Sequence, residues 1–396
     1  MTALAIAVAC ATLGQQWYDT APVYNTEHWV MRTDLAPNDA VEAGRLLDAV
    51  YEAYRNGLSM LPGKRNERME AWVFLRKSDY NTTVQSRTRG DSGVVENSAG
   101  VFFTDSSGLQ VTAVTVADAW KNFERTAKHE AFHQFAHTRF VNPLPQWVNE
   151  GLAEYFEHSG YINGAIVPGQ VEERDLAILQ QALQTGRYVP FLQMMRMSNQ
   201  EWGQGLKGPG STIQYLQAWS MVHFLIHGDD GKHVDQFDRF LLLMSEGMDD
   251  EEAFVKAFGT NDLQSFEQAW ANHVSQLIPS STMTAARRLS YMAMGMLELN
   301  RRGRSAVSLD ELRAGLQTID YRPTLTLQYE DVSFDPSDDT TFVIPADSFS
   351  HEQPAFVVKP GRPLPSLATE GLEPYNLRVR WTQHDGDISW TIDVGR

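Results

Sequence analysis

The stretch that decides the fold is HEAFH at residues 129–133, which lies in a run without glycine or proline from Ala119 to Phe140. An uninterrupted run of this length predicts a long helix. Side chains four residues apart lie on one face of a helix, so His129 and His133 are neighbours that can share a metal ion. Glu130 projects to the side of that face, where a carboxylate can act on a metal-activated water. The motif therefore predicts a metal-binding helix with an adjacent general base.

A second helix is expected directly after the first. Pro143 and Pro145 stop the first helix, and the sequence PQWVNEGLAEYF at residues 145–156 begins the next. Two prolines between the helices favour a hairpin, which would bring Glu150 back towards the histidines. Alone, HEAFH is also compatible with two surface histidines that bind no metal. Two imidazoles and a carboxylate leave a zinc ion one open position, so Glu150 is expected to complete a site for one Zn²⁺ per chain.

The combination of HEAFH and WVNEGLAEYFE resembles the gluzincin metallopeptidases, particularly the helix pair of aminopeptidase-N-like and thermolysin-like enzymes. It is most similar to uncharacterised, exported bacterial proteins of the gluzincin type. The resemblance covers residues 119–227. It implies that His129, His133 and Glu150 bind zinc and that Glu130 is the general base.

The same resemblance implies a role for Tyr215, in the segment YLQAW at the expected start of a helix, in stabilising an oxyanion. An N-terminal packing role for this tyrosine is an equal alternative. The connection from His133 to Glu150 is shorter than in aminopeptidase-N-like enzymes, and no Gly-x-Met-Glu-Asn motif precedes it. The strand expected at 100–104 lacks an acidic residue for a substrate amine, so the pattern does not favour an aminopeptidase. Arg139 stands where a metzincin would have its third histidine.

Three residues near the motif are candidates for contacts behind the metal ligands. Glu154 lies one turn after Glu150, where it can orient a ligand histidine or be a solvated helix charge. His137 lies one turn after His133, where a packed or exposed position is the alternative to a contact with substrate or a carboxylate. Asn149 is expected to fix backbone geometry rather than touch the metal.

These residues predict zinc-dependent hydrolysis of a peptide or protein substrate, by an endopeptidase or oligopeptidase in which Glu130 accepts a proton from the metal-activated water. One alternative is a zinc hydrolase of a non-peptide bond. The other is a non-catalytic protein that keeps the zinc helix pair as a scaffold for binding. The intact Glu130 disfavours this second alternative, because a structural zinc site needs no general base.

The composition is that of a globular chain with an acidic surface. Of 396 residues, 42% are hydrophobic and 21% charged, and 50 Asp and Glu against 33 Lys and Arg give a net charge of −17. Such a surface repels phosphate backbones, so nucleic acid is not an expected partner. No stretch approaches the ~18 apolar residues of a membrane span. The oligomeric state is left open.

The first 14 residues resemble a secretory signal segment, because Ala3 to Leu13 is almost wholly small and apolar. Export to the periplasm or outside the cell is therefore expected. A buried N-terminal helix of a cytoplasmic protein is the alternative. Cys10 is the only cysteine in the chain, which excludes an intramolecular disulfide.

The order of predicted elements indicates an α+β fold. Short alternating runs, among them Tyr24–Thr33 and Gly100–Thr104, predict a sheet before the HEAFH helix. A glycine-rich segment from Gly203 to Ser211 predicts a loop that can act as a lid beside Tyr215. The expected regions are a signal-like segment (1–14), an N-terminal α/β subdomain (15–118), a helical zinc-binding catalytic region (119–278), a helical connector (279–320) and a β-rich C-terminal module (321–396).

Overall fold

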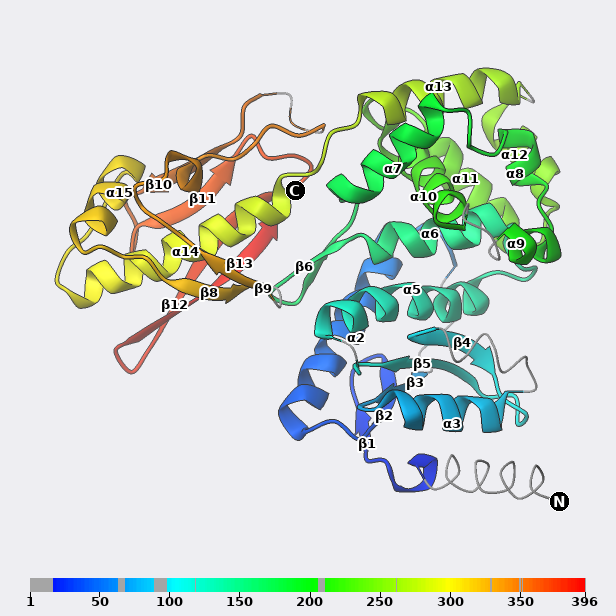
Figure 1. Ribbon diagram of the computed structural model, residues 1–396, viewed down its shortest axis with the longest axis horizontal. Coiled ribbons are helices and arrows are strands. Elements are labelled where there is room, and N and C mark those ends of the chain that lie inside the picture. The colour runs from blue at the N-terminus through cyan, green and yellow to red at the C-terminus, as the bar shows by residue number, and fades with distance from the viewer. Residues whose placement is uncertain are drawn as a thin grey trace. The chain divides into compact units, whose positions relative to one another are not determined.

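A computed structural model describes residues 17–62, 68–88, 98–117, 119–205, 211–260, 262–327, 330–348, 350 and 352–395. The fold is α+β, which confirms the predicted class (Figure 1). The chain divides into two compact units, of which the first contains Met1–His158 and Ala177–Ser275 and the second contains Ser159–Leu176 and Gln276–Arg396. The signal-like segment, with Cys10, lies outside the described residues.

A five-stranded sheet in the order β1-β2-β3-β5-β4 forms the N-terminal part of the first unit. Its inner strands β2, β3 and β5 are parallel, and the outer strands β1 and β4 are antiparallel to their neighbours. The strand predicted from Tyr24 to Thr33 is interrupted, because Thr26 closes a turn on Trp29 and the segment forms the β1-β2 hairpin, with β2 in its second half. The strands are β1 (Val23–Asn25), β2 (Trp29–Thr33), β3 (Met69–Phe74), β4 (Gly100–Thr104) and β5 (Gln110–Thr115).

Helices cover both faces of this sheet (Figure 1). Val111 and Ala113 of β5 belong to an apolar cluster with Tyr80 of α3. Between them, Thr112 points to the opposite face, where its hydroxyl lies 2.7 Å from the side-chain oxygen of Gln134 in α5. The helix with the HEAFH motif therefore packs directly on β5 and on the edge strand β4. The helices are α2 (Pro37–Gly57), α3 (Lys77–Arg87) and α5 (Trp120–Arg139).

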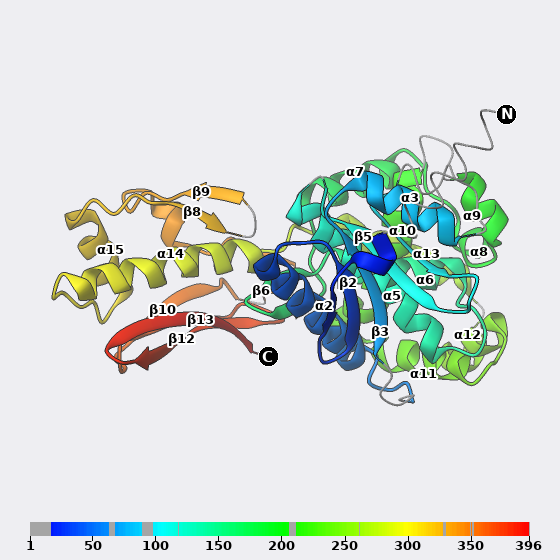
Figure 2. The ribbon, with the colours of Figure 1, turned by 90° about the horizontal axis from the view of Figure 1, so that it is seen from below.

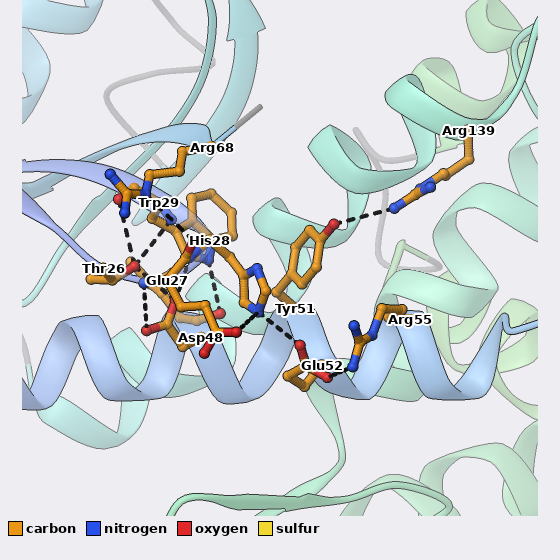
Figure 3. A network of polar contacts seen from close by, with 11 residues as sticks. Thr26, Glu27, His28, Trp29, Asp48, Tyr51, Glu52, Arg55, Arg68 and Arg139 are labelled. Carbon is orange, nitrogen blue, oxygen red and sulfur yellow. Dashed lines mark hydrogen bonds and ion pairs between the residues drawn. The ribbon is translucent and has the colours of Figure 1, made fainter. Parts of the chain in front are cut away.

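A polar network on α2 connects the β1-β2 hairpin to the end of α5 (Figure 3). Asp48 accepts a hydrogen bond from the backbone N–H of His28 at 3.0 Å, and the imidazole of that histidine contacts Glu52 at 2.7 Å. The same imidazole stacks on Tyr51 at 4.1 Å between ring centroids. The hydroxyl of Tyr51 accepts a hydrogen bond from Arg139 at 3.2 Å. Arg139 thus fixes the last turn of α5 against α2.

The rest of the first unit is helical, and α6 lies between α5 and α10 (Figure 1). Tyr215 lies in the second turn of α10, not at its start, because this helix begins at Ser211. Gly203, predicted to be in a loop, belongs to α9, while residues 206–210 of that predicted loop lie outside the described residues. The remaining elements are α6 (Gln146–Glu157), α7 (Glu173–Gln184), α8 (Phe191–Met195), α9 (Asn199–Gly205), α10 (Ser211–His227), the 3₁₀ helix η1 (Gly228–Gly231), α11 (Val234–Ser245), α12 (Asp250–Phe258) and α13 (Leu263–Gln276).

The second unit is built around the antiparallel sheet β10-β11-β12-β13. Figure 2 shows α14 between this sheet and the β8-β9 hairpin. Leu289 and Met292 of α14 share one apolar core with Leu367 and Leu377 of the sheet, so the helices expected as a connector contribute to the core of the β strands. The elements are β6 (Gly160–Ile162), β7 (Ala165–Val167), α14 (Thr282–Arg301), α15 (Leu309–Thr318), β8 (Thr324–Leu327), β9 (Glu330–Ser333), the 3₁₀ helix η2 (Asp339–Phe342), β10 (Ala355–Lys359), β11 (Ser366–Glu370), β12 (Asn376–His384) and β13 (Asp387–Gly395).

None of the helices in the described part of the chain combines the length and the apolar character that crossing a membrane requires.

Candidate metal centre

The helix pair α5 and α6 brings together the three residues expected to bind a metal. His129 and His133 lie one turn apart on α5, with ring centroids 4.8 Å apart. The Oε2 atom of Glu150, on α6, lies 3.4 Å from Nε2 of His129 and 3.7 Å from Nε2 of His133. The three potential ligand atoms therefore converge on one point between the two helices.

The bonding of Glu150 fits a metal at this point. Its Oε2 atom is buried and has no hydrogen-bond partner. A buried carboxylate oxygen without a partner is costly, and a cation held jointly with two imidazoles would satisfy it. Two histidines and one glutamate are also a ligand set that catalytic zinc takes, with one position left for water or substrate.

The charges around His129 favour a positive charge in the centre. Burial lowers the pKa of this imidazole, but Glu150, Glu157 and Glu154 together raise its pKa well above the ordinary value. Three carboxylates around one buried imidazole attract a cation of either kind, a proton or a metal ion.

Each ligand histidine has a partner for its second ring nitrogen. Nδ1 of His129 lies 2.9 Å from Oε2 of Glu157, and the other oxygen of that carboxylate accepts from Arg125 at 3.0 Å. Nδ1 of His133 lies 3.3 Å from Oδ1 of Asn149. Such contacts fix the tautomer and leave both Nε2 atoms directed at the shared point. Asn149 thus touches a candidate ligand side chain, and Glu157 is a site residue that sequence reasoning missed.

Glu154 lies behind the centre but contacts His129 less closely than Glu157 does. Its carboxylate is 3.6 Å from Nδ1 of His129 and 3.6 Å from Nδ1 of His158. Burial and the charge of Glu157 raise the pKa of Glu154. Burial opposes ionisation of Glu157 as well, but its hydrogen bond to His129 and the charge of Arg125 lower its pKa. The pKa values of the two carboxyl groups therefore shift in opposite directions, and Glu157 is the stronger acid of the pair.

Glu130 lies beside the ligand atoms, next to the edge strand β4. Its Oε2 atom accepts a hydrogen bond from the backbone N–H of Phe102 at 2.8 Å. Gly100 permits this close approach, because a Cβ atom there would lie 2.4 Å from Cγ2 of Thr126 and 3.0 Å from Cγ of Glu130. The carboxylate is thus held between the metal-binding helix and the sheet edge.

Tyr215 reaches the same centre from α10. Its ring lies edge-to-face on His129, with centroids 6.3 Å apart, and Trp202 packs against its other side. Burial and the charge of Glu150 raise the pKa of Tyr215 to about 12, so its hydroxyl is a neutral donor at pH 7. Gly151 allows α6 and α10 to touch, because a Cβ atom there would lie 2.5 Å from the carbonyl oxygen of Ala218.

A cavity of about 350 Å³ opens beside the centre. His133 and Glu150 line it, and so does His137, on the next turn of α5. The ring of His137 lies 5.7 Å from that of Phe102. His137 therefore lies in the cavity rather than behind the ligands. The apolar lining residues are Phe102, Ala136, Phe140, Val141, Pro143 and Leu144.

Residues 124–247 match a family described as a protein of unknown function (DUF1570). The matched segment contains all three candidate metal ligands. It also contains Glu130, Glu157 and Tyr215. No curated protein matches the chain.

Proposed function

We propose that this protein is a zinc-dependent peptidase in which His129, His133 and Glu150 hold the metal and Glu130 is the general base. The observation that carries the proposal is the unpartnered, buried Oε2 atom of Glu150, which faces the Nε2 atoms of both histidines. Glu130 adds a second carboxylate beside this ligand set, where a purely structural zinc site would have no use for one.

The residues around the centre divide the chemistry between them. When bound, zinc lowers the pKa of a coordinated water towards ~7 and polarises a carbonyl group. Glu130 accepts the proton of the attacking water and delivers it to the nitrogen of the leaving amine. Tyr215 donates its hydroxyl proton in a hydrogen bond to the carbonyl oxygen as negative charge develops there.

The edge strand favours a peptide over another substrate. β4 pairs only with β5, so its outer edge is free of a neighbouring strand among the described residues. The N–H of Phe102 points to Glu130 rather than into the ladder with β5, which marks this edge as the side nearest the reacting groups. An extended peptide can add to such an edge through backbone hydrogen bonds. A small ester or amide offers no matching row of groups.

The test is a digest of a mixed peptide library by the full-length, zinc-loaded protein, with the cleavage products identified by mass spectrometry. Glu130→Gln should keep one zinc per chain and lose ~10²–10⁴-fold of the cleavage rate. Glu246→Gln, which changes an exposed glutamate, is the matched control and should cleave like the wild type.

Three outcomes are distinct. Cleavage that disappears in Glu130→Gln but not in the control supports a peptidase. Bound zinc without cleavage of any peptide would instead favour hydrolysis of a non-peptide bond. A protein that binds no zinc would leave only a scaffold.

A further inference from the structure

We infer that the cavity beside His133 binds an aromatic side chain of the substrate, from a residue next to the cleaved bond. This inference rests on the proposed function and adds its substrate class. The cavity is lined by His133 and Glu150 and also by Phe102, whose backbone N–H is bound to Glu130. A side chain in this cavity therefore belongs to a residue whose backbone lies at the reacting groups.

The lining of the cavity excludes charged side chains. Among the described residues that line it there is no lysine or arginine, and the one carboxylate is that of Glu150, the proposed metal ligand. The other polar groups are the imidazoles of His133 and His137 and uncharged amides. A charged side chain would lose its hydration here without gaining an opposite charge, which is costly.

The shape and chemistry of the walls favour an aromatic ring. Phe102 and His137 contribute two rings tilted by 53° to the lining of the cavity, and Phe140 contributes a third. Rings of this kind pack favourably edge-to-face or offset against another aromatic ring. A volume of about 350 Å³ also leaves a small aliphatic side chain poorly packed.

The amides at the mouth suit an aromatic side chain with a polar tip. Asn142 and Asn199 are exposed at this rim, and Gln146 donates to Asn199 at 2.6 Å. Amide groups offer both donors and acceptors, so they can bond to a tyrosine hydroxyl or an indole N–H. Tyrosine and tryptophan should therefore be accepted at least as well as phenylalanine.

The first experiment measures cleavage of peptides that differ at one position beside the cleaved bond. Aromatic residues should exceed alanine at least ~10-fold in kcat/KM, and aspartate and lysine should be the poorest. Asn142→Asp should raise the ratio of kcat/KM for the lysine peptide to that for the aspartate peptide about 3- to 5-fold. Asn142→Lys should lower this ratio. The same pair of changes at Asn272, exposed on α13 and outside the cavity, is the matched control.

A second experiment tests the inference by binding alone, without turnover. Zinc-loaded Glu130→Gln is titrated by calorimetry with acetylated tripeptide amides that carry tyrosine, alanine, aspartate or lysine in the centre. Tighter binding of the tyrosine peptide, weakened by the charged variants at Asn142 and not at Asn272, supports the cavity as the binding site. Equal binding of the four peptides would overturn the inference, and so would cleavage without an aromatic preference. Failure of the proposed function differs from both, because it shows as absent cleavage alongside selective binding.

Discussion

Nδ1 of His129 lies 2.9 Å from Oε2 of Glu157, and Glu157 follows the proposed ligand Glu150 by two helical turns on α6. Residues seven apart lie on one face of a helix, so α6 supplies both a ligand and the carboxylate that orients another ligand. Arg125, one turn before His129 on α5, binds Glu157 from the other side. The two helices are therefore coupled through the metal site on both sides of His129.

Glu157→Gln should weaken zinc binding by about 10- to 100-fold, because a neutral amide accepts more weakly from Nδ1 of His129 and lacks the negative charge that makes the imidazole more basic. Glu154→Gln should have a smaller effect, since the Glu154 carboxylate lies 3.6 Å from Nδ1 of His129. Competition with a chromophoric chelator measures both affinities. Equal losses in the two variants would contradict the assignment of Glu157 as the orienting residue.

Glu150→Ala should remove the third ligand and with it the stabilisation that zinc gives to the fold. A ligand at 1,000 times its Kd stabilises the folded state by about 4 kcal/mol, so zinc should raise the Tm of the wild type clearly. The Tm of Glu150→Ala should respond little to the same zinc concentration, while Glu246→Gln should respond like the wild type. A full zinc response in Glu150→Ala would exclude Glu150 from the ligand set.

Much of this site could be predicted from sequence, because its parts lie on regular helices. The spacing of HEAFH places two histidines on one helical face, and the prolines at 143 and 145 end that helix where the structure ends it. Glu157 was not predicted as a site residue, because Glu154 lies only one turn after Glu150 and was expected to orient a ligand histidine instead. Which of the two neighbouring carboxylates reaches His129 depends on the angle at which α5 and α6 cross. The periodicity of the sequence does not indicate this angle.

Two elements of the fold were missed for different reasons. α3 has a polar sequence with almost no apolar periodicity, and it is held by packing of Tyr80 and Val84 on the sheet. Tertiary contacts, not local pattern, decide such a helix. The β6-β7 hairpin did carry a signal: Asn163 and Gly164 both have positive φ values, as the turn of a tight hairpin requires, and Asn-Gly is its commonest sequence.

Tyr215→Phe should lower kcat by about 10²- to 10³-fold if the hydroxyl donates to the developing oxyanion. Zinc affinity should not change, because the ring packing on His129 is retained. Tyr24→Phe, on β1 and far along the sheet from β4, is the control. Steady-state kinetics on one good peptide from the library decide the matter, and an unchanged kcat would leave Tyr215 a packing residue.

Gly151→Ala should destabilise the first unit by about 1–3 kcal/mol, because the new methyl group would lie 2.5 Å from the carbonyl oxygen of Ala218 and force α6 and α10 apart. Gly203→Ala, on α9, is the matched control. Among the described residues, no atom outside the helix's own neighbouring backbone lies within 4 Å of its added methyl group, and the higher helix propensity of alanine should stabilise it by up to about 1 kcal/mol. Urea denaturation gives both values, and equal effects would refute the close helix contact.

Two histidines away from the candidate metal centre should each make a contribution to the stability of the first unit that is lost as the pH falls below about 6.5. His129 and Glu154, whose pKa values are raised, contribute in the opposite direction, so the effect of the two histidines is measured as a difference between variants. Burial lowers the pKa of His227 to about 3, with a further contribution from His273, and burial lowers the pKa of His273 to about 4. Both imidazoles are therefore neutral in the folded state at pH 5, whereas an unfolded histidine with a pKa of ~6.5 binds a proton. Since the unfolded state then binds more protons, stability is full above pH 6.5 and is lost progressively towards the folded pKa values.

Below pH ~6.5 each histidine lowers the free energy of unfolding by about 1.4 kcal/mol per pH unit. Between pH 7.5 and 5.5 the two histidines together should therefore lower it by about 2–3 kcal/mol. Relative to the wild type, His227→Gln should keep about 1.4 kcal/mol more stability over this change of pH, because glutamine does not titrate and its amide can still bond to the hydroxyl of Tyr155, which lies 2.9 Å from the imidazole. His384→Gln changes an exposed histidine of the second unit and should keep the wild-type dependence. Urea denaturation of metal-free protein at the two pH values measures the difference. If the stability of His227→Gln changed with pH just as that of the wild type does, the neutral imidazole of His227 would make no acid-sensitive contribution.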